Sequence, residues 1–245
     1  MTILNSTTFE NISSSDFQYQ NPYPWVNIKD FLSKETFEEL FKTLPDPSQM
    51  ESEFGRKRGY GQQSHDRLSL QYRPGLKLSQ AWHEFIAVLQ GDQYKRFIRE
   101  MYGLKANEPV VLTMHWHYAK AGCSVSPHVD ARRKLGSHIF YFHKDEEWNE
   151  SWGGQTVVLR SANDIDPHSA PGFDQFETVA SSKITNNSSF MFYRTDDSWH
   201  GVKPLLCPED RLRKVFIVVI NKLTFQVRWR ALRGKDADGY KWLVS

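Results

Sequence analysis

The chain has 245 residues, of which 39% are hydrophobic and 24% are charged, the balance of an ordinary globular protein. Its 31 basic and 29 acidic residues leave a net charge of +2, so neither nucleic acid nor a membrane surface is an expected partner. The longest apolar run, Val215 to Ile220, is far shorter than the ~20 residues that cross a bilayer. The first residues lack the basic start and apolar stretch of a signal peptide. Only two cysteines occur, Cys123 and Cys207, which favours a cytoplasmic protein over a secreted disulfide scaffold.

The N-terminal third is predicted to be helical after a loose polar arm over residues 1–20. Ser33 is a good N-cap, and the apolar residues at positions 37, 40, 41 and 44 have the spacing of one helix face. Pro45 ends this helix because proline cannot continue it. The same spacing predicts a second helix after Ser79 and a third helix from Asp92, each closed by a glycine.

Beyond Pro109 the apolar period changes from 3.6 to 2, which is typical of β-strands. The segment 224–233 alternates as well and could form a further strand or a short helix. We therefore expect one domain from residue 21 onward, in which a helical part (21–108) packs on a β sandwich or barrel (109–221) that precedes a C-terminal extension (222–245). The expected strands cover residues 110–118, 137–142, 155–160, 176–180, 189–193 and 213–221.

A candidate metal site begins at His128 and Asp130, which flank Val129. Residues two apart on a strand point to the same side, so both side chains can reach one ion. His200 is the best third ligand, and two histidines with one carboxylate form the facial triad that suits Fe(II). A bare His-x-Asp is common and could be a chance surface pair. Four further features favour the metal site: the glycine pair in Trp152-Gly153-Gly154-Gln155, the stretch Trp199-His200-Gly201-Val202 after a strand, Arg213 opening an apolar strand, and Tyr118 ten residues before His128.

With these motifs in place, residues 22–221 resemble the Fe(II)- and 2-oxoglutarate-dependent dioxygenases, in the prolyl-hydroxylase branch. The opening Pro22-Tyr23-Pro24-Trp25-Val26-Asn27-Ile28 looks like the N-terminal strand of bacterial members. The order His-x-Asp, Gly-Gly, distal His and Arg is also that of the family. The resemblance implies a mainly β fold with α-helices, a distorted double-stranded β-helix or jelly roll buttressed by N-terminal helices.

The resemblance also implies the activity and the ligand set. His128, Asp130 and His200 match the iron ligands and thus the catalytic centre, and the retained carboxylate disfavours halogenation. Oxidative decarboxylation of 2-oxoglutarate with O2 would be coupled to hydroxylation of an unactivated C–H bond, in a prolyl or other amino-acid residue or in a small molecule. The resemblance allows ascorbate as an accessory cofactor. The alternative is a non-catalytic sensor that binds metal and 2-oxoglutarate on the same fold.

Three residues match positions that hold 2-oxoglutarate in the family. Arg213 matches the arginine that pairs with the far carboxylate, and a guanidinium is suited to such a bidentate pair. Arg211, two residues earlier, is the fallback for this role. Tyr141 matches a tyrosine on the same carboxylate, and Tyr118 matches a tyrosine near the metal end of the cosubstrate.

The remaining charged residues, loops and histidines are less specific in their pattern. The run Arg132-Arg133-Lys134 is either a solvated loop or a rim that attracts an acidic substrate. The loops 50–78 and 161–185 are expected to decide specificity, because loops on a rigid scaffold carry it. His115-Trp116-His117 is similar to a cupin metal motif but lacks its glutamate. The remaining histidines show no partner spacing and are expected to be surface or structural residues: His65, His83, His138, His143 and His168.

Overall fold

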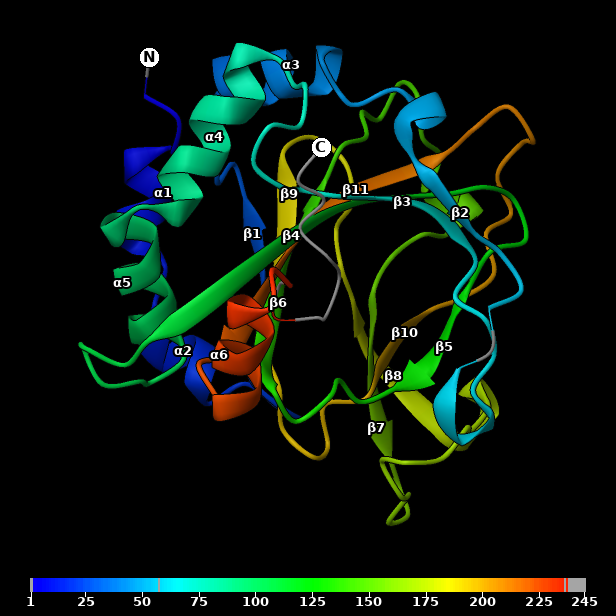
Figure 1. Cartoon of the computed structure of the whole chain (residues 1–245). Coiled ribbons are helices and arrows are strands. Elements are labelled where there is room, and N and C mark those ends of the chain that lie inside the picture. The colour runs from blue at the N-terminus through cyan, green and yellow to red at the C-terminus, as the bar shows by residue number, and fades with distance from the viewer. Residues whose placement is uncertain (1, 57, 236, 238–245) are drawn as a thin grey trace.

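The computed structural model describes residues 2–56, 58–235 and 237 (Figure 1). Within them, eleven strands form two antiparallel sheets and six α-helices gather mainly on one side. The larger sheet has the order β1 (Trp25–Lys29), β9 (Ser188–Tyr193), β6 (Lys134–Tyr141), β11 (Arg213–Lys222), β4 (Val110–Ala119), β3 (Arg67–Gln71), β2 (Glu51–Glu53). The smaller sheet has the order β5 (Val125–His128), β10 (His200–Val202), β7 (Val157–Ser161), β8 (Phe176–Ser181).

The two sheets pack face to face as a distorted double-stranded β-helix, which confirms the predicted fold class. Their shared core joins Ile139 and Phe190 of the larger sheet to Val158 and Val202 of the smaller one. Six of the strands were expected from the apolar period, and each lies within a few residues of its predicted bounds, while β1 forms where the resemblance implied an N-terminal strand. No described helix is both long and apolar enough to span a membrane.

Helices cover the other face of the larger sheet. They are α1 (Ser6–Asn11), α2 (Ser14–Gln18), α3 (Lys34–Lys42), α4 (Gln80–Gln90) and α5 (Asp92–Met101). The hydroxyl of Ser33 caps α3 as predicted, accepting from the backbone N–H of Thr36, and the hydroxyl of Ser79 caps α4 in the same way by accepting from the backbone N–H of Trp82. Trp82 lies at the centre of this second core, with its ring centroid 5.0 Å from that of Trp116. The helical layer thus covers one face of the larger sheet, and the opposite face is turned towards the smaller sheet.

Successive side chains of the central strands point alternately into the helical core and into a cavity between the two sheets. On β11, Phe216, Val218 and Ile220 pack in the helical core, whereas Ile217 and Val219 line a cavity between the sheets. The same alternation holds on β4 and β6, because they pair with β11 in register on either side. A polar residue on one of these strands therefore reaches the cavity only if it has the correct parity.

One expectation for the chain ends needs correction. Residues 2–20 are not a loose arm: they form α1 and α2, and Leu4 and Phe17 are buried against the helical core. Of the two alternatives for the segment 224–233, the structure has the short helix, α6 (Phe225–Leu232), with Thr224 as its N-cap. In the predicted extension 222–245, residues 236 and 238–245 lie outside the described part of the chain.

Candidate metal centre

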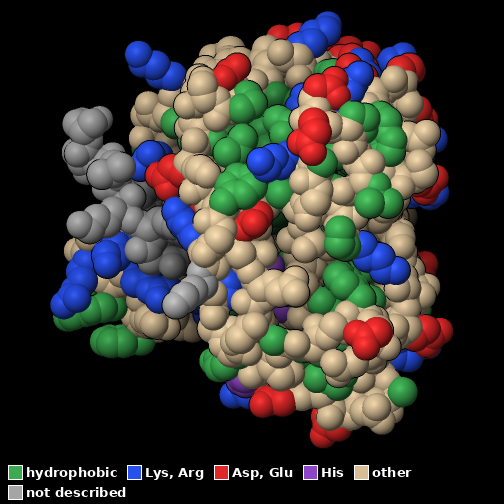
Figure 2. All heavy atoms as spheres, turned by 90° about the vertical axis from the view of Figure 1, so that its right-hand side faces the viewer, with side chains coloured by type: hydrophobic (Ala, Val, Ile, Leu, Met, Phe, Trp, Pro, Cys, Tyr) green, Lys and Arg blue, Asp and Glu red, His purple; other side chains and the backbone are tan. Residues whose placement is uncertain are grey.

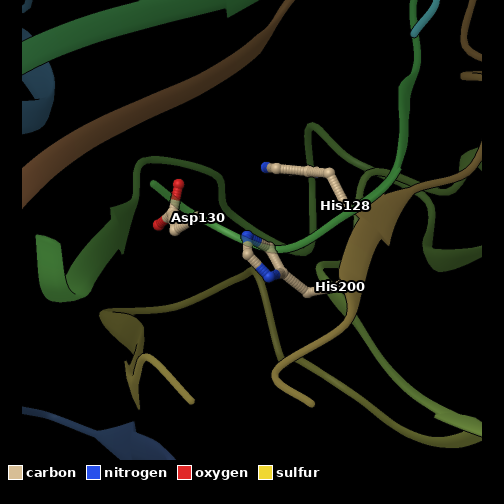
Figure 3. Close-up of side chains that lie close together, drawn as sticks. All are labelled: His128, Asp130 and His200. Carbon is tan, nitrogen blue, oxygen red and sulfur yellow. The ribbon is translucent and has the colours of Figure 1, made fainter. Parts of the chain in front are cut away.

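The register of two short strands builds the candidate metal centre. His200, the first residue of β10, pairs directly with His128, the last residue of β5, and Asp130 follows in the next turn. The donor atoms of the three side chains all lie within 4.8 Å of one another. Figure 3 shows the three side chains converging on one region. Among the described residues this is the only such group of three, so the structure brings together the three residues that the sequence singled out.

Both imidazoles are oriented by the backbone. The Nδ1 atom of His128 lies 2.9 Å from the carbonyl oxygen of Ser126, and Nδ1 of His200 lies 2.9 Å from that of Ser198. A carbonyl can only accept, so each Nδ1 carries the proton and donates it. Each Nε2 therefore keeps its lone pair, as a metal ligand requires.

The protonation states also favour a cation. Burial lowers the pKa of His128 to about 3, and burial likewise lowers the pKa of His200, so both rings are neutral at physiological pH. Burial raises the pKa of Asp130, but the nearby Lys134 ammonium and the two imidazoles outweigh this and hold it well below its usual range. The site thus presents two neutral nitrogens and one carboxylate.

One cavity of about 210 Å³ connects this centre to Arg213. Arg213 is the first residue of β11 and is 7% exposed. Its Nε donates to the carbonyl oxygen of Gly154 at 2.6 Å. No carboxylate in the described part of the chain pairs with it, so this cation is buried without an anion. Arg211, the fallback for this role, is half exposed and lies 3.6 Å from the carboxylate of Asp210, outside the cavity lining.

Gly154 explains the role of the glycine pair. Its φ is +94°, and a Cβ there would lie 3.2 Å from Cδ of Arg213 and 3.3 Å from the Trp148 ring. A side chain would therefore strain the backbone and press on the guanidinium. The Gly-Gly motif thus lets the chain pass close enough to Arg213 to accept its hydrogen bond.

Tyr141 lies beside Arg213, as predicted. The guanidinium carbon lies 5.5 Å from the centre of the Tyr141 ring. The tyrosine hydroxyl is buried and lies 2.8 Å from Thr156 Oγ1, and Ser182 Oγ donates to it at 2.8 Å. Thr156 itself lines the cavity. Arg213 and Thr156 thus line the cavity together, whereas Tyr141 contacts both of them without itself lining the cavity.

The structure does not bring Tyr118 to this cavity. Its hydroxyl donates to the carbonyl oxygen of Pro45 at 3.0 Å, and its ring belongs to the helical core. The residues of β4 that line the cavity are His117 and Ala119, one position to either side. His117, and not Tyr118, is therefore the residue of this pair that faces the cavity.

Two cavity residues, His65 and Lys134, were missed, and the sequence did not tell His117 apart from His115 as the one that faces the cavity. His65 was expected at the surface or in a structural role, yet it lines the cavity with its ring 5.0 Å from that of His128. Lys134, read as part of a basic run, donates to Oδ1 of Asp130 at 2.7 Å. His117 could have been found from strand parity once the register with β11 was known. No local pattern marks His65, because it lies in a loop before β3.

Residues 113–219 match the family model described as the 2OG-Fe(II) oxygenase superfamily. The β core belongs to this superfamily. No curated protein matches the chain by sequence. Fe(II), 2-oxoglutarate and O2 are therefore the metal, the cosubstrate and the oxidant of this dioxygenase, and the centre of two neutral imidazoles and one carboxylate fits Fe(II).

Solved structures of the oxygenase fold are similar over most of the chain. A prolyl-4-hydroxylase from Pseudomonas putida is 15% identical with a TM-score of 0.57, and the match covers 86% of this chain and 99% of that one. A prolyl hydroxylase from Trichoplax adhaerens is 13% identical with a TM-score of 0.55, covering 85% and 89%. The carbocyclase SnoK from nogalamycin biosynthesis is 13% identical with a TM-score of 0.59, covering 89% and 87%. These likenesses confirm a prolyl-hydroxylase-like fold for the oxygenase.

Proposed function

We propose that His128, Asp130 and His200 are the Fe(II) ligands of this oxygenase. The observation that carries the proposal is their geometry: three donor atoms within 4.8 Å, with each imidazole turned by a backbone carbonyl so that Nε2 is available. A chance surface pair of His and Asp would have neither this convergence nor this burial. The arrangement supplies three ligands and leaves the remaining positions of an octahedral ion to small molecules.

We propose further that Arg213 binds the far carboxylate of 2-oxoglutarate, with Tyr141 and Thr156 beside it. A buried guanidinium without an anion is costly, and a carboxylate in the same cavity offsets that cost through a charge-assisted pair. His117, from the cavity face of β4, is placed to contact the same molecule in the position expected for Tyr118. Arg211 is excluded from this role in the proposal because it lies outside the cavity.

The reaction we propose is hydroxylation of an unactivated C–H bond. Bound Fe(II), with 2-oxoglutarate and O2, supplies the oxidising chemistry. The chain orients the cosubstrate through Arg213 and keeps Asp130 ionised through Lys134. Phe192, whose ring centroid lies 4.4 Å from that of His200, covers one side of the centre and limits access of water.

The similar solved structures indicate which classes of substrate the fold can accommodate. The similar structures include two prolyl hydroxylases, one of them in complex with a hypoxia inducible factor peptide, and the carbocyclase SnoK. A prolyl or other amino-acid residue and a small molecule are both compatible with this fold. The free and buried Cys123 and Cys207 support a reducing, cytoplasmic compartment, because thiols persist there.

The test is formation of succinate from 2-oxoglutarate with Fe(II) and O2, together with metal binding by calorimetry. The wild-type protein should bind one Fe(II) and form succinate, whereas His128→Ala, Asp130→Ala and His200→Ala should each lose both while remaining folded. His83→Ala, which removes an exposed imidazole far from the cavity lining, is the matched control. Tight binding of metal and 2-oxoglutarate without any succinate would instead support the non-catalytic sensor.

A further inference from the structure

A second cavity adjoins the metal centre. It has a volume of about 580 Å³ and is lined by His128 and Asp130 together with the turn that follows them, residues 131–134. His128, Asp130, Lys134 and Arg58 line both this groove and the inner cavity, so the two spaces meet at the metal ligands. On the face seen in Figure 2, histidine side chains are visible deep in a hollow. A molecule in the groove would therefore have direct access to the candidate iron.

The groove is strongly cationic. Asp130 is its only carboxylate among the described lining residues. Its five cationic side chains are Arg58, Arg132, Arg133, Lys134 and Arg194. A chain with a net charge of only +2 thus concentrates positive charge at one place, beside its reactive centre.

Only part of this charge is balanced by the protein. Lys134 pairs with Asp130, and Arg194 pairs with the exposed Asp196 at 2.7 Å. Arg132 is exposed at the rim and forms no ion pair with any described residue. In the loaded enzyme the charges of Fe(II), Asp130, 2-oxoglutarate and Arg213 would sum to zero, so the charge of Lys134 would no longer be offset by Asp130. Lys134 and Arg132 would then leave positive charge at the groove for another anion.

Two loops border the groove. The Tyr60 ring lies 4.8 Å from the His168 ring, and Nε2 of Gln62 donates to the carbonyl oxygen of Ser169 at 3.3 Å. Tyr60 has a φ of +60°, which is uncommon for a residue with a side chain and is typical of functional loops. These are the loops 50–78 and 161–185 that were expected to decide specificity, and they meet at the cationic lining.

From these observations we infer that the groove binds an anionic group of the substrate, a carboxylate or a phosphate, and that the oxygenase acts on a small organic molecule carrying at least two negative charges. Arginine forks bind either group in a bidentate manner. The groove volume lies within the range of small-molecule sites. The inference rests on the proposed function, because it takes the metal centre as the place of reaction.

The test uses the full chain, saturated with Fe(II) and 2-oxoglutarate without oxygen, and titrated by calorimetry with inorganic pyrophosphate and, separately, with tricarballylate. At least one anion should bind, more weakly as salt is added. The double variant Arg58→Ala, Arg132→Ala should weaken this binding at least tenfold. Both residues are exposed, so the fold should survive. Arg160→Ala, at an exposed arginine of β7 outside the groove, should leave the binding unchanged. Stronger binding of pyrophosphate would assign a phosphate, and stronger binding of tricarballylate a carboxylate.

Two outcomes would overturn the inference in distinguishable ways. If neither anion binds, or if the double variant binds as well as the wild type, the anionic substrate is wrong while the oxygenase assignment stands. If Fe(II) or 2-oxoglutarate itself does not bind in the first step, the proposed function and the inference that rests on it both fail.

Discussion

The ammonium of Lys134 lies 2.7 Å from Oδ1 of Asp130, four residues before it, at the entrance to β6. This contact places a cation directly behind a candidate metal ligand. It keeps the carboxylate ionised in a buried site and leaves the second carboxylate oxygen for a metal ion. Lys134 of the basic run thus stabilises a candidate metal ligand. Neither alternative considered for this run, a solvated loop or a rim that attracts an acidic substrate, included that role.

Lys134→Met should make metal binding sensitive to acid. In the wild type the pKa of His128 is about 3 and the pKa of Asp130 is well below normal, so neither of these two ligands takes up a proton between pH 7.5 and 5.5. For a free imidazole of pKa ~6.5, the neutral fraction that can bind a metal falls about tenfold over this range. Without the ammonium, burial raises the pKa of Asp130, and protonation begins at higher pH. Calorimetry with Co(II) at both pH values should show a larger drop in affinity for the variant.

The ratio of affinities at the two pH values is the quantity to compare, because loss of a cation also raises metal affinity at every pH. Lys183→Met, at a lysine that is 71% exposed, is the matched control. An equal ratio in the variant and the wild type would mean that Lys134 does not control the ionisation of Asp130.

Arg213→Ala should greatly raise the requirement for 2-oxoglutarate and leave metal affinity nearly unchanged. Removing one member of a buried charge pair costs about 3–5 kcal/mol, which corresponds to roughly 10²–10³ or more in affinity. Arg213→Lys should rescue only part of this, because an ammonium lacks the bidentate fork. The measurement is the 2-oxoglutarate dependence of succinate formation, with Arg211→Ala as control. A large effect at Arg211 and a small one at Arg213 would contradict the assignment.

Gly201→Ala should weaken metal binding by disturbing the pairing of the two histidines. A Cβ at this position would lie 2.7 Å from the carbonyl oxygen of Val125 and 3.0 Å from the Phe173 ring. Because the first atom is backbone of β5, β10 must shift away from it. Gly59→Ala, which has open space around it, should bind metal as the wild type does. Unchanged metal affinity in Gly201→Ala would show that the centre tolerates a displaced β10.

The buried His138 should make folding stability depend on pH. Its Nδ1 lies 3.0 Å from the Tyr94 hydroxyl and its Nε2 3.0 Å from Ser189 Oγ. Burial lowers its pKa to about 3, below the ~6.5 of an unfolded chain. The unfolded state therefore binds the proton first, and the free energy of unfolding falls as pH drops from 6.5 towards 3, by about 1.4 kcal/mol per pH unit for this residue.

His138→Gln keeps a donor and an acceptor but cannot titrate. Urea unfolding of metal-free protein between pH 6 and 4 should therefore show a slope shallower by about 1.4 kcal/mol per pH unit than in the wild type. His168→Gln, at a half-exposed imidazole, should keep the wild-type slope. Equal slopes for His138→Gln and the wild type would show that His138 is not protonated on unfolding.

The long strands and capped helices were predictable because their signals are local. The change of period after Pro109 marked β4 and β11, the Ser33 cap marked α3, and the apolar spacing after Ser79 marked α4. Strands β5 and β10 were missed, although they carry the ligands. They have four and three residues, and β5 contains Pro127, so pairing between distant segments and not local pattern defines them.

The site shows the same limit. The spacing of His128 and Asp130 suggested two ligands, but the parity of Tyr118 depends on how β4 pairs with β11, where Tyr118 faces Lys214 and His117 faces Val215. A shift of one residue exchanges the two faces of a strand. Burial of the N-terminal segment was also hidden, because Leu4 and Phe17 are isolated apolar residues in a polar stretch.

β5 is the edge strand of the smaller sheet, and β10 is its only neighbour there among the described strands. An ion held by His128, Asp130 and His200 would act as a cross-link between two strands that have few hydrogen bonds of their own. Fraying of this edge would then require release of the ion, so amide hydrogens of β5 and β10 would exchange with solvent more slowly as the free metal concentration rises. At one hundred times the dissociation constant the added protection would reach about 2.7 kcal/mol. The β5–β10 edge of the oxygenase would thus be more ordered with the metal ion bound than without it.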